Sequence, residues 1–141
     1  MLIDVKHRLN EPEIRDLLAY AVFPEPEALE RAVHSYSESE QLLYAYEEEG
    51  RLVGVIGILP EQDGFQITHI AVAPEERRKG IGEEMIVLAA EQRDAIQISA
   101  ETDDDAVDFY RKVGFIVTSL GETFPGVERY LCTWNRDEDS E

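Results

Sequence analysis

The 141 residues are enough for one domain around one hydrophobic core, and 43% of them are hydrophobic, as in ordinary globular proteins. The formal net charge of −18 argues against nucleic-acid and anionic-membrane partners, because an acidic surface repels phosphate groups. No apolar run approaches the ~20 residues that span a bilayer, and the charged N-terminus does not resemble a signal peptide.

The acidity itself has two explanations. It would attract a cationic acceptor such as a polyamine, an aminoglycoside or a basic peptide. The simpler explanation is solubility, or a host whose proteins are generally acidic, since net charge bears on solubility and encounter rather than on a site.

A strand and two helices are predicted at the start of the chain. Polar and apolar residues partly alternate over 2–9, which predicts a first strand. Asn10 as N-cap and Pro12 in the first turn predict a helix after it. A second helix is expected over about 26–34, followed by a loop at 36–39.

Three antiparallel strands are expected next. The β-rich runs 42–47 and 52–59 flank a turn at 48–51, which predicts a hairpin. A second turn at 60–64 leads into an apolar, β-branched strand at 67–72, which is expected to be largely buried.

Directly after this strand come three cations, Arg77, Arg78 and Lys79, and then Gly80 and Gly82. Helical spacing of apolar residues predicts that a helix begins at these glycines. The first turn of a helix leaves N–H groups unpaired, its dipole adds partial positive charge, and glycine lets an anion approach the backbone. The segment therefore predicts a phosphate or pyrophosphate site, and the alternative is an ordinary helix start with a solvated basic turn.

Two better-known phosphate loops fit this segment less well. A P-loop needs Gly-Lys-Ser/Thr, but Glu83 follows Gly82 here. A dinucleotide fingerprint needs a third glycine or alanine three residues after its second, where this chain has Met85.

A parallel strand and another helix are predicted further on. The helix after the glycines ends near 92–94, and the strand at 96–101 is then parallel to the central one through a right-handed crossover. Thr102 and Asp105 approximate a capping box before the next helix. The three aspartates there are therefore expected to cap the helix rather than to bind a metal.

Residues 115–120 and 127–134 are expected to form a final hairpin, with an acidic, disordered tail at 136–141. The single cysteine, Cys132, falls in an alternating strand pattern and is expected to be a small core residue. One cysteine cannot form an internal disulfide, so a cytoplasmic location is the simplest expectation. The chain contains no repeat, and we expect a single domain over 1–135.

Two motifs in this order carry the most information. The first is Arg77-x-x-Gly80-x-Gly82, after a strand that ends Ile70-Ala71-Val72, and the second is Ala106-x-x-Phe109-Tyr110-x-Lys112-x-Gly114-Phe115. Together they resemble the two hallmarks of the GCN5-related N-acetyltransferase (GNAT) family, over about residues 52–115. The resemblance implies an α+β (mixed α/β) fold: a mostly antiparallel sheet of about seven strands with one parallel pair at its centre, flanked by about four helices.

The same resemblance implies acetyl-CoA as cosubstrate, no metal, and transfer of the acetyl group to a primary amine of a small molecule or peptide. It implies that the backbone of Ile70, Ala71 and Val72 holds the pantetheine arm and polarises the thioester carbonyl. It assigns the pyrophosphate to Arg77, Arg78, Lys79, Gly80, Ile81, Gly82 and Glu83. Tyr110 matches the family tyrosine that acts as general acid at the sulfur, and the alternative is an ordinary core tyrosine.

The general base stays unassigned at this point. Gln66 stands where some members of the family carry a glutamate, and Thr68 shares its face by strand alternation. His69 has a suitable pKa range but the opposite parity, unless a bulge re-aims it. Glu101, at the end of the next strand, and a chain of waters are further candidates.

In the family the acceptor lies between the first helices and the last hairpin, which makes candidates of Phe23, Glu25, Tyr36, Glu122 and Phe124. The carboxylates of Glu83 and Glu84 are expected to point away from the phosphates. Two alternatives to an N-acetyltransferase remain. One is a catalytically silent acyl-CoA-binding module, and the other is a nucleotide-binding domain that holds ATP at the glycine loop. A monomer and a homodimer are both compatible with the sequence.

Overall fold

The computed structural model of this protein describes residues 1–22 and 24–136. The strands are β1 (Leu2–Asp4), β2 (Leu42–Glu48), β3 (Arg51–Glu61), β4 (Gly64–Val72), β5 (Gln97–Asp103), β6 (Ile116–Phe124) and β7 (Val127–Asn135). The helices are α1 (Pro12–Ala19), α2 (Pro26–Glu38), α3 (Ile81–Arg93) and α4 (Val107–Lys112), with 3-10 turns η1 (Lys6–Arg8) and η2 (Pro74–Glu76).

Within the described residues, the seven strands form one sheet in the order β1-β2-β3-β4-β5-β7-β6. Strands β4 and β5 are parallel, and every other neighbouring pair is antiparallel. The crossover helix α3 connects the parallel pair, as an α-helix usually does. This arrangement confirms the predicted mixed fold with one parallel pair at the centre of the sheet.

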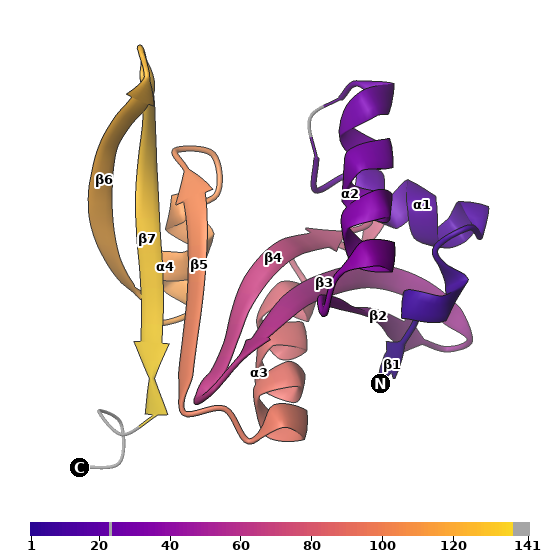
Figure 1. The fold of residues 1–141 in the computed structure, drawn as a ribbon. Coiled ribbons are helices and arrows are strands. Elements are labelled where there is room, and N and C mark those ends of the chain that lie inside the picture. Colours follow the sequence, from indigo (N-terminus) through magenta and orange to yellow (C-terminus); the bar gives the residue numbers. More distant parts are fainter. Residues whose placement is uncertain (23, 137–141) are drawn as a thin grey trace.

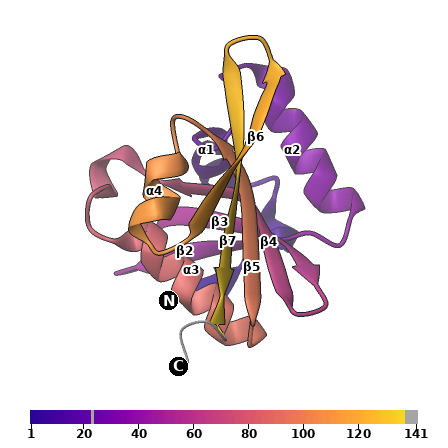
Figure 2. The same cartoon turned by 90° about the vertical axis from the view of Figure 1, so that its left-hand side faces the viewer.

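The sheet separates two hydrophobic cores. On one face, Phe65, Ile67 and Ile98 pack with Met85 of α3 and Tyr110 of α4. On the other face, the second core includes Ile14 and Leu18 of α1, Tyr36 of α2, and Val55 and Ala71 of the sheet. Figure 2, which views the sheet from the side of β6 and β7, shows α4 on one side of these strands and α2 on the other.

The parallel pair comes apart part-way along its length. Pairing begins at Gly64 with Gln97 and stops at Ile67 with Ala100, although both strands continue. Beyond that point β5 stays paired to β7 as far as Asp103 with Arg129, while β4 stays paired to β3. Figure 1 shows the two strands diverging from their shared end. The second half of β4 therefore presents a row of backbone N–H and C=O groups towards β5 without a strand partner in the described structure.

Two predictions near the N-terminus are corrected by local hydrogen bonds. The first strand ends at Asp4, because the Asp4 carboxylate accepts from the backbone N–H of Lys6 at 2.9 Å and turns the chain into η1. The N-cap of α1 is Glu11 rather than Asn10, and Pro12 occupies the first helical position. Arg8 donates to the Glu11 carboxylate at 2.9 Å, so this carboxylate holds the preceding turn.

The second helix is longer than predicted. It continues to Glu38 through the segment expected to be a loop. Ala28, Ala32 and Tyr36 follow one another at every fourth residue and are all buried, so the apolar face extends the helix. This extension brings Tyr36 over the sheet.

The capping box predicted before α4 does not form. Thr102 and Asp103 belong to β5, and Ala106 occupies the N-cap with no side-chain cap. The Asp103 carboxylate instead accepts from the backbone N–H of Asp105 at 3.0 Å, within the turn between β5 and α4. The last hairpin is also tighter than predicted, because β6 extends to Phe124.

Three further sequence predictions concern the core, the tail and membranes. Cys132 is fully buried in the first core, as predicted. Of the predicted tail, Arg136 pairs with Asp94 at 2.8 Å, and the rest lies outside the described residues. Among the helices of the described chain, none has both the length and the apolar character needed to cross a bilayer.

Candidate active site

A cavity of about 760 Å³ opens where β4 and β5 diverge. Its walls come from the segment between α1 and α2, from α2, from the second half of β4, from the end of β5 and the turn after it, from α4, and from β7. The polar and aromatic side chains in its lining are Tyr20, Arg31, Thr68, His69, Glu101, Thr102, Asp103, Asp105, Tyr110 and Arg129.

The predicted phosphate segment lies between β4 and α3. The N-cap of α3 is Gly80 in the left-handed conformation, with a φ of 80°, and in the described chain no side chain caps this helix. Its first turn therefore keeps unpaired N–H groups, which together with the helix dipole favour an anion. A Cβ at Gly82 would lie 3.0 Å from the Phe109 ring, so this glycine lets α3 approach α4 closely.

Two of the three cations of this segment, Lys79 and Arg77, already have partners in the described chain. Lys79 donates to the Glu76 carboxylate at 2.9 Å, and Arg51 pairs with its second oxygen at 2.7 Å. These donors, Lys79 first, hold the pKa of Glu76 below its usual range. Arg77 donates to the Val72 carbonyl at 3.0 Å.

Arg77 and Arg78 differ in how far they are already engaged. The Arg77 guanidinium lies over the ring of Tyr20, 5.8 Å from its centroid, in a cation–π arrangement. Arg78 is exposed, forms no ion pair or hydrogen bond with any described residue, and has a φ of 68°. A non-glycine residue with a positive φ is strained. Arg78 therefore combines an unpaired positive charge with an unfavourable backbone conformation.

Of the two glutamates in the first turn of α3, Glu84 is bound to a neighbouring side chain and Glu83 is exposed. Glu84 accepts from the Tyr46 hydroxyl at 2.7 Å, and this bond raises the pKa of Tyr46 to about 12. Glu83 borders a second, separate cavity of about 420 Å³ that α3 forms with β7 and the end of α4. The expectation that the Glu84 carboxylate points away from the phosphate segment is met.

Tyr110 both packs in the core and lines the cavity. Its ring meets Phe109 and Phe115 edge-on, with centroids 5.1 Å and 5.3 Å away, and only 4% of the residue is exposed. Its hydroxyl bonds to no other described residue. Burial raises the pKa of Tyr110 above its ordinary value, so the phenol keeps its proton at neutral pH.

A bulge in β4 decides where His69 points. Ile67 pairs with Ile58 and His69 pairs with Gly57, which leaves Thr68 as the extra residue. Both Thr68 and His69 therefore reach the Tyr36 hydroxyl, at 2.8 Å to Thr68 Oγ1 and 2.7 Å to His69 Nδ1. The strand parity expected from alternation is thus broken, and His69 lines the cavity.

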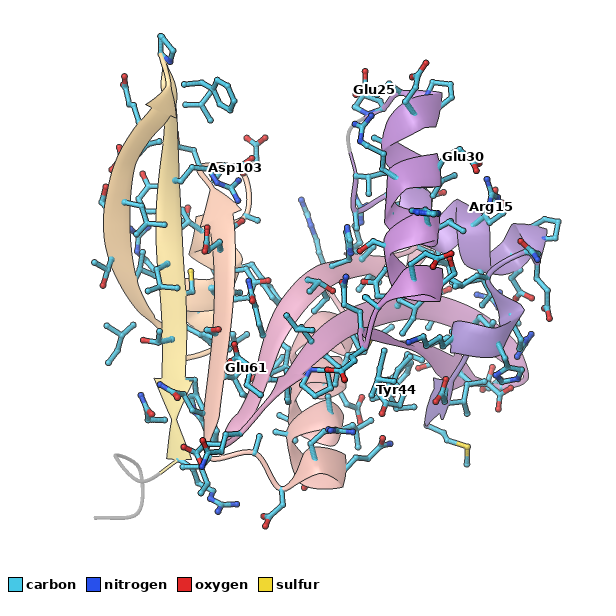
Figure 3. All side chains as sticks on the ribbon, in the orientation of Figure 1. Arg15, Glu25, Glu30, Tyr44, Glu61 and Asp103 are labelled. Atoms are coloured by element: carbon cyan, nitrogen blue, oxygen red, sulfur yellow. The ribbon has the colours of Figure 1, made fainter. Side chains whose placement is uncertain are left out.

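Other predicted residues lie in different places. Gln66 is not part of the cavity lining, whereas Glu101 is. Glu25 pairs with Arg31 at 3.4 Å and stands at the start of α2, across from Asp103 at the end of β5 (Figure 3). Glu25 itself does not line the cavity.

The hairpin candidates also lie away from the lining. Glu122 accepts from the backbone N–H of Gly126 at 3.3 Å, Phe124 is 69% exposed, and neither borders the cavity. Phe23 lies outside the described residues. The sequence analysis missed Arg31 and Arg129, because an isolated arginine carries no motif. The sequence analysis did single out the aspartates at 103–105, but it interpreted them as helix caps.

A comparison with known protein families identifies the family of this chain. Residues 11–128 match the model of the acetyltransferase (GNAT) domain. The chain belongs to the GNAT family. The resemblance found in the two sequence motifs is confirmed. Family membership and the observed sheet agree, because the same motifs that carry the resemblance flank the opening between β4 and β5.

Individual relatives of this GNAT chain are distant. A candidate (ribosomal protein bS18)-alanine N-acetyltransferase of Bacillus subtilis is 32% identical over 99 residues, which are 65% of this chain and 66% of that protein. The chain spans only 27% of the length of a second curated relative from the same organism.

Solved structures share the fold over nearly the whole chain. A candidate acetyltransferase of the GNAT family from Desulfovibrio desulfuricans has a TM-score of 0.81 at 16% identity, covering 96% of this chain and 98% of that one. An aminoglycoside 6′-N-acetyltransferase complexed with coenzyme A has a TM-score of 0.75 at 18% identity, covering 96% of both chains. At these identities the likeness establishes the fold.

Proposed function

We propose that this chain transfers an acetyl group from acetyl-CoA to a primary amine. The observation that carries the proposal is the loss of pairing between β4 and β5 beyond Ile67. It leaves a half-strand with unpaired backbone groups that leads directly to an uncapped, cation-flanked helix N-terminus. A ligand with an amide-rich arm and a diphosphate at one end matches that succession of donors and acceptors.

The diphosphate would be held at the start of α3. The N–H groups of Ile81, Gly82 and Glu83 are the unpaired donors of its first turn, and Gly80 leaves them open to approach. Arg78 supplies an unengaged full charge, while Arg77 and Lys79 are already held by neighbouring groups. The carboxylate of Glu84 is turned to Tyr46, so it does not oppose the anion.

The pantetheine arm would pair with the free edge of β4 at Ile70, Ala71 and Val72. This is strand addition at an exposed edge, in which backbone hydrogen bonds supply the affinity. A backbone N–H of the same segment would stabilise the charge that develops on the thioester oxygen during attack.

Tyr110 would act as general acid. When the amine attacks the carbonyl carbon, the C–N bond forms, the C–S bond breaks, and the leaving sulfur takes the phenolic proton. Since burial raises the pKa of Tyr110, the phenol is protonated before the reaction, and the phenolate left behind is basic enough to recover its proton quickly. Tyr110 lines the cavity and its hydroxyl has no protein partner in the described chain, which leaves it available to the sulfur.

The acceptor class that fits best is an amine on a molecule with further positive charge. Glu101, Asp103 and Asp105 line the cavity on the side of β5, opposite α2. Arg31 and Arg129 share the lining, so the acids outnumber the bases there by one. The relatives named for aminoglycosides and for the alanine of a ribosomal protein differ widely, which makes a panel necessary.

The test is amine-dependent release of the CoA thiol, measured over polyamines, aminoglycosides, amino acids and peptides. We expect release with one cationic class and little with neutral amines. Acetyl-CoA binding without release across a broad panel would instead support the silent binding module. Calorimetric binding of ATP at an affinity equal to that of CoA would support a nucleotide-binding domain.

A further inference from the structure

The proposed chemistry leaves the proton of the attacking amine without a destination. His69 is the histidine among the cavity-lining residues, and the bulge at Thr68 is what turns it there. Its Nδ1 lies 2.7 Å from the hydroxyl of Tyr36, which is completely buried. No described residue bonds to its other ring nitrogen, Nε2.

The site of Tyr36 is built to hold this hydroxyl over β4. A Cβ at Gly57 would overlap the Tyr36 hydroxyl and lie 2.8 Å from Thr68 Oγ1. The glycine on β3, the extra residue on β4 and the extended end of α2 thus meet at one point. The Tyr36 hydroxyl therefore occupies space that a side chain at position 57 would fill, within hydrogen-bond distance of both Thr68 and His69.

Two arrangements of protons fit these two distances and also give the buried Tyr36 hydroxyl hydrogen an acceptor. In the first, His69 Nδ1–H donates to the Tyr36 oxygen and the Tyr36 hydroxyl donates to Thr68, so Nε2 carries a lone pair. In the second, the Thr68 hydroxyl donates to Tyr36 and Tyr36 donates to Nδ1, so Nε2 carries the hydrogen and cannot accept a proton.

The first arrangement serves both charge states of the histidine. An imidazolium carries hydrogens on both nitrogens, and its Nδ1–H needs the Tyr36 oxygen as an acceptor. In the first arrangement that bond already exists, so His69 can gain and lose a proton at Nε2 without turning either hydroxyl. A preset network of this kind costs no reorganisation at the moment of reaction.

We infer that His69 is the general base of the proposed acetyl transfer, and that Tyr36 and Thr68 are positioning residues that hold its Nε2 ready to accept the proton. The inference rests on the proposed function. As the amine nitrogen bonds to the carbonyl carbon, Nε2 takes a proton from that nitrogen. The thioester sulfur takes the Tyr110 proton as the C–S bond breaks, and one proton then passes from the imidazolium to the phenolate, directly or through water.

The surroundings of His69 suit a base. Burial lowers its pKa, so the ring is neutral at physiological pH. Besides Tyr36, the titratable or charged groups around the same cavity are Tyr20, Arg31, Glu101, Asp103, Asp105, Tyr110 and Arg129. The acids among them would stabilise the imidazolium that forms, and the arginines would oppose it.

Glu101 is the rival base within the same cavity. It is exposed, and no hydrogen bond from the described chain orients its carboxylate. His69→Gln and Glu101→Gln are therefore a matched pair, since each replaces a candidate base with an uncharged amide. We expect kcat/KM to fall by about 100-fold or more in His69→Gln and by less than about 10-fold in Glu101→Gln.

Two variants of Thr68 test the positioning network directly. Thr68→Val removes the acceptor of the Tyr36 hydroxyl, which should then turn to Nδ1 and move the histidine hydrogen to Nε2. Thr68→Ser keeps the acceptor and should recover most of the turnover lost in Thr68→Val. Nitrogen-15 NMR of the His69 ring should show Nδ1–H in the wild type and in Thr68→Ser, and Nε2–H in Thr68→Val.

Tyr36→Phe gives an independent readout. Without the Tyr36 oxygen the imidazolium loses an acceptor, so the acidic limb of the kcat/KM profile should move to lower pH while the plateau falls about 10-fold. An Nε2–H tautomer in the wild type, or full turnover in His69→Gln, would overturn the inference while the acetyl transfer stands. A wild-type chain that binds acetyl-CoA and acetylates nothing would overturn the proposed function itself.

Discussion

Replacing Tyr110 with phenylalanine removes one oxygen atom, and it should affect turnover without affecting the stability of the fold. Tyr110→Phe keeps the ring and its edge-on contacts with Phe109 and Phe115, at 5.1 Å and 5.3 Å. The lost hydroxyl has no hydrogen-bond partner in the described chain, so no buried group is left unpaired. The free energy of unfolding should therefore change by no more than about 0.5 kcal/mol.

Turnover should respond very differently. A positioned general acid contributes about 100- to 10,000-fold, so we expect kcat to fall by at least about 100-fold, which corresponds to about 2.7 kcal/mol of transition-state stabilisation. The assay is the initial rate of CoA thiol release at saturating acetyl-CoA, with acetyl-CoA affinity measured separately by calorimetry. Affinity should be nearly unchanged, because phenylalanine fills the same space.

Tyr44→Phe is the matched control. Tyr44 is also a buried tyrosine with a free hydroxyl among the described residues, but it belongs to β2 and does not line the cavity (Figure 3). Its substitution should leave kcat unchanged. If Tyr110→Phe keeps wild-type kcat, Tyr110 is a core residue and the acid role assigned to it is wrong.

Other predictions follow from the same site. Gly57→Ala should lower the free energy of unfolding by about 1–3 kcal/mol, because its Cβ overlaps the Tyr36 hydroxyl, and by clearly less in a Tyr36→Leu background. Chemical denaturation of the wild type, the two single variants and the double variant measures this coupling. Equal effects of Gly57→Ala in both backgrounds would refute the clash. Burial lowers the folded-state pKa of His69 below 6.5, so the unfolded chain binds more protons and the stability that His69 contributes is lost as pH falls below that value. Thermal unfolding should show the margin of wild type over His69→Gln shrinking from pH 7.5 to 5, and a constant margin would contradict it.

The start of α3 at the glycines and the central strand could be predicted from the sequence because their signals are local. Three cations before two glycines, at the junction of an apolar strand and an amphipathic helix, specify a helix N-terminus whatever the rest of the chain does. The parallel pairing of β4 and β5 followed from the crossover rule in the same way.

The position of His69 could not be predicted, because a bulge belongs to two strands at once. Alternation within β4 places His69 on the wrong face, and only the register against β3 shows that Thr68 is extra. The spacing of Ala28, Ala32 and Tyr36 does indicate the longer α2, but it does not indicate the partners of the Tyr36 hydroxyl, which lie more than thirty residues further along the chain. Contacts of that kind leave no periodic pattern in a single sequence.

Binding of coenzyme A to an Arg78→Gly variant tests the central claim most directly. Arg78 carries the free charge at a φ of 68°, so glycine removes the charge and relieves about 1 kcal/mol of backbone strain. By calorimetry, CoA should bind at least about 10-fold more weakly to a chain that is no less stable, while pantetheine, which lacks the diphosphate, binds both chains equally. Equal CoA affinity for the two chains would contradict a diphosphate site at the start of α3.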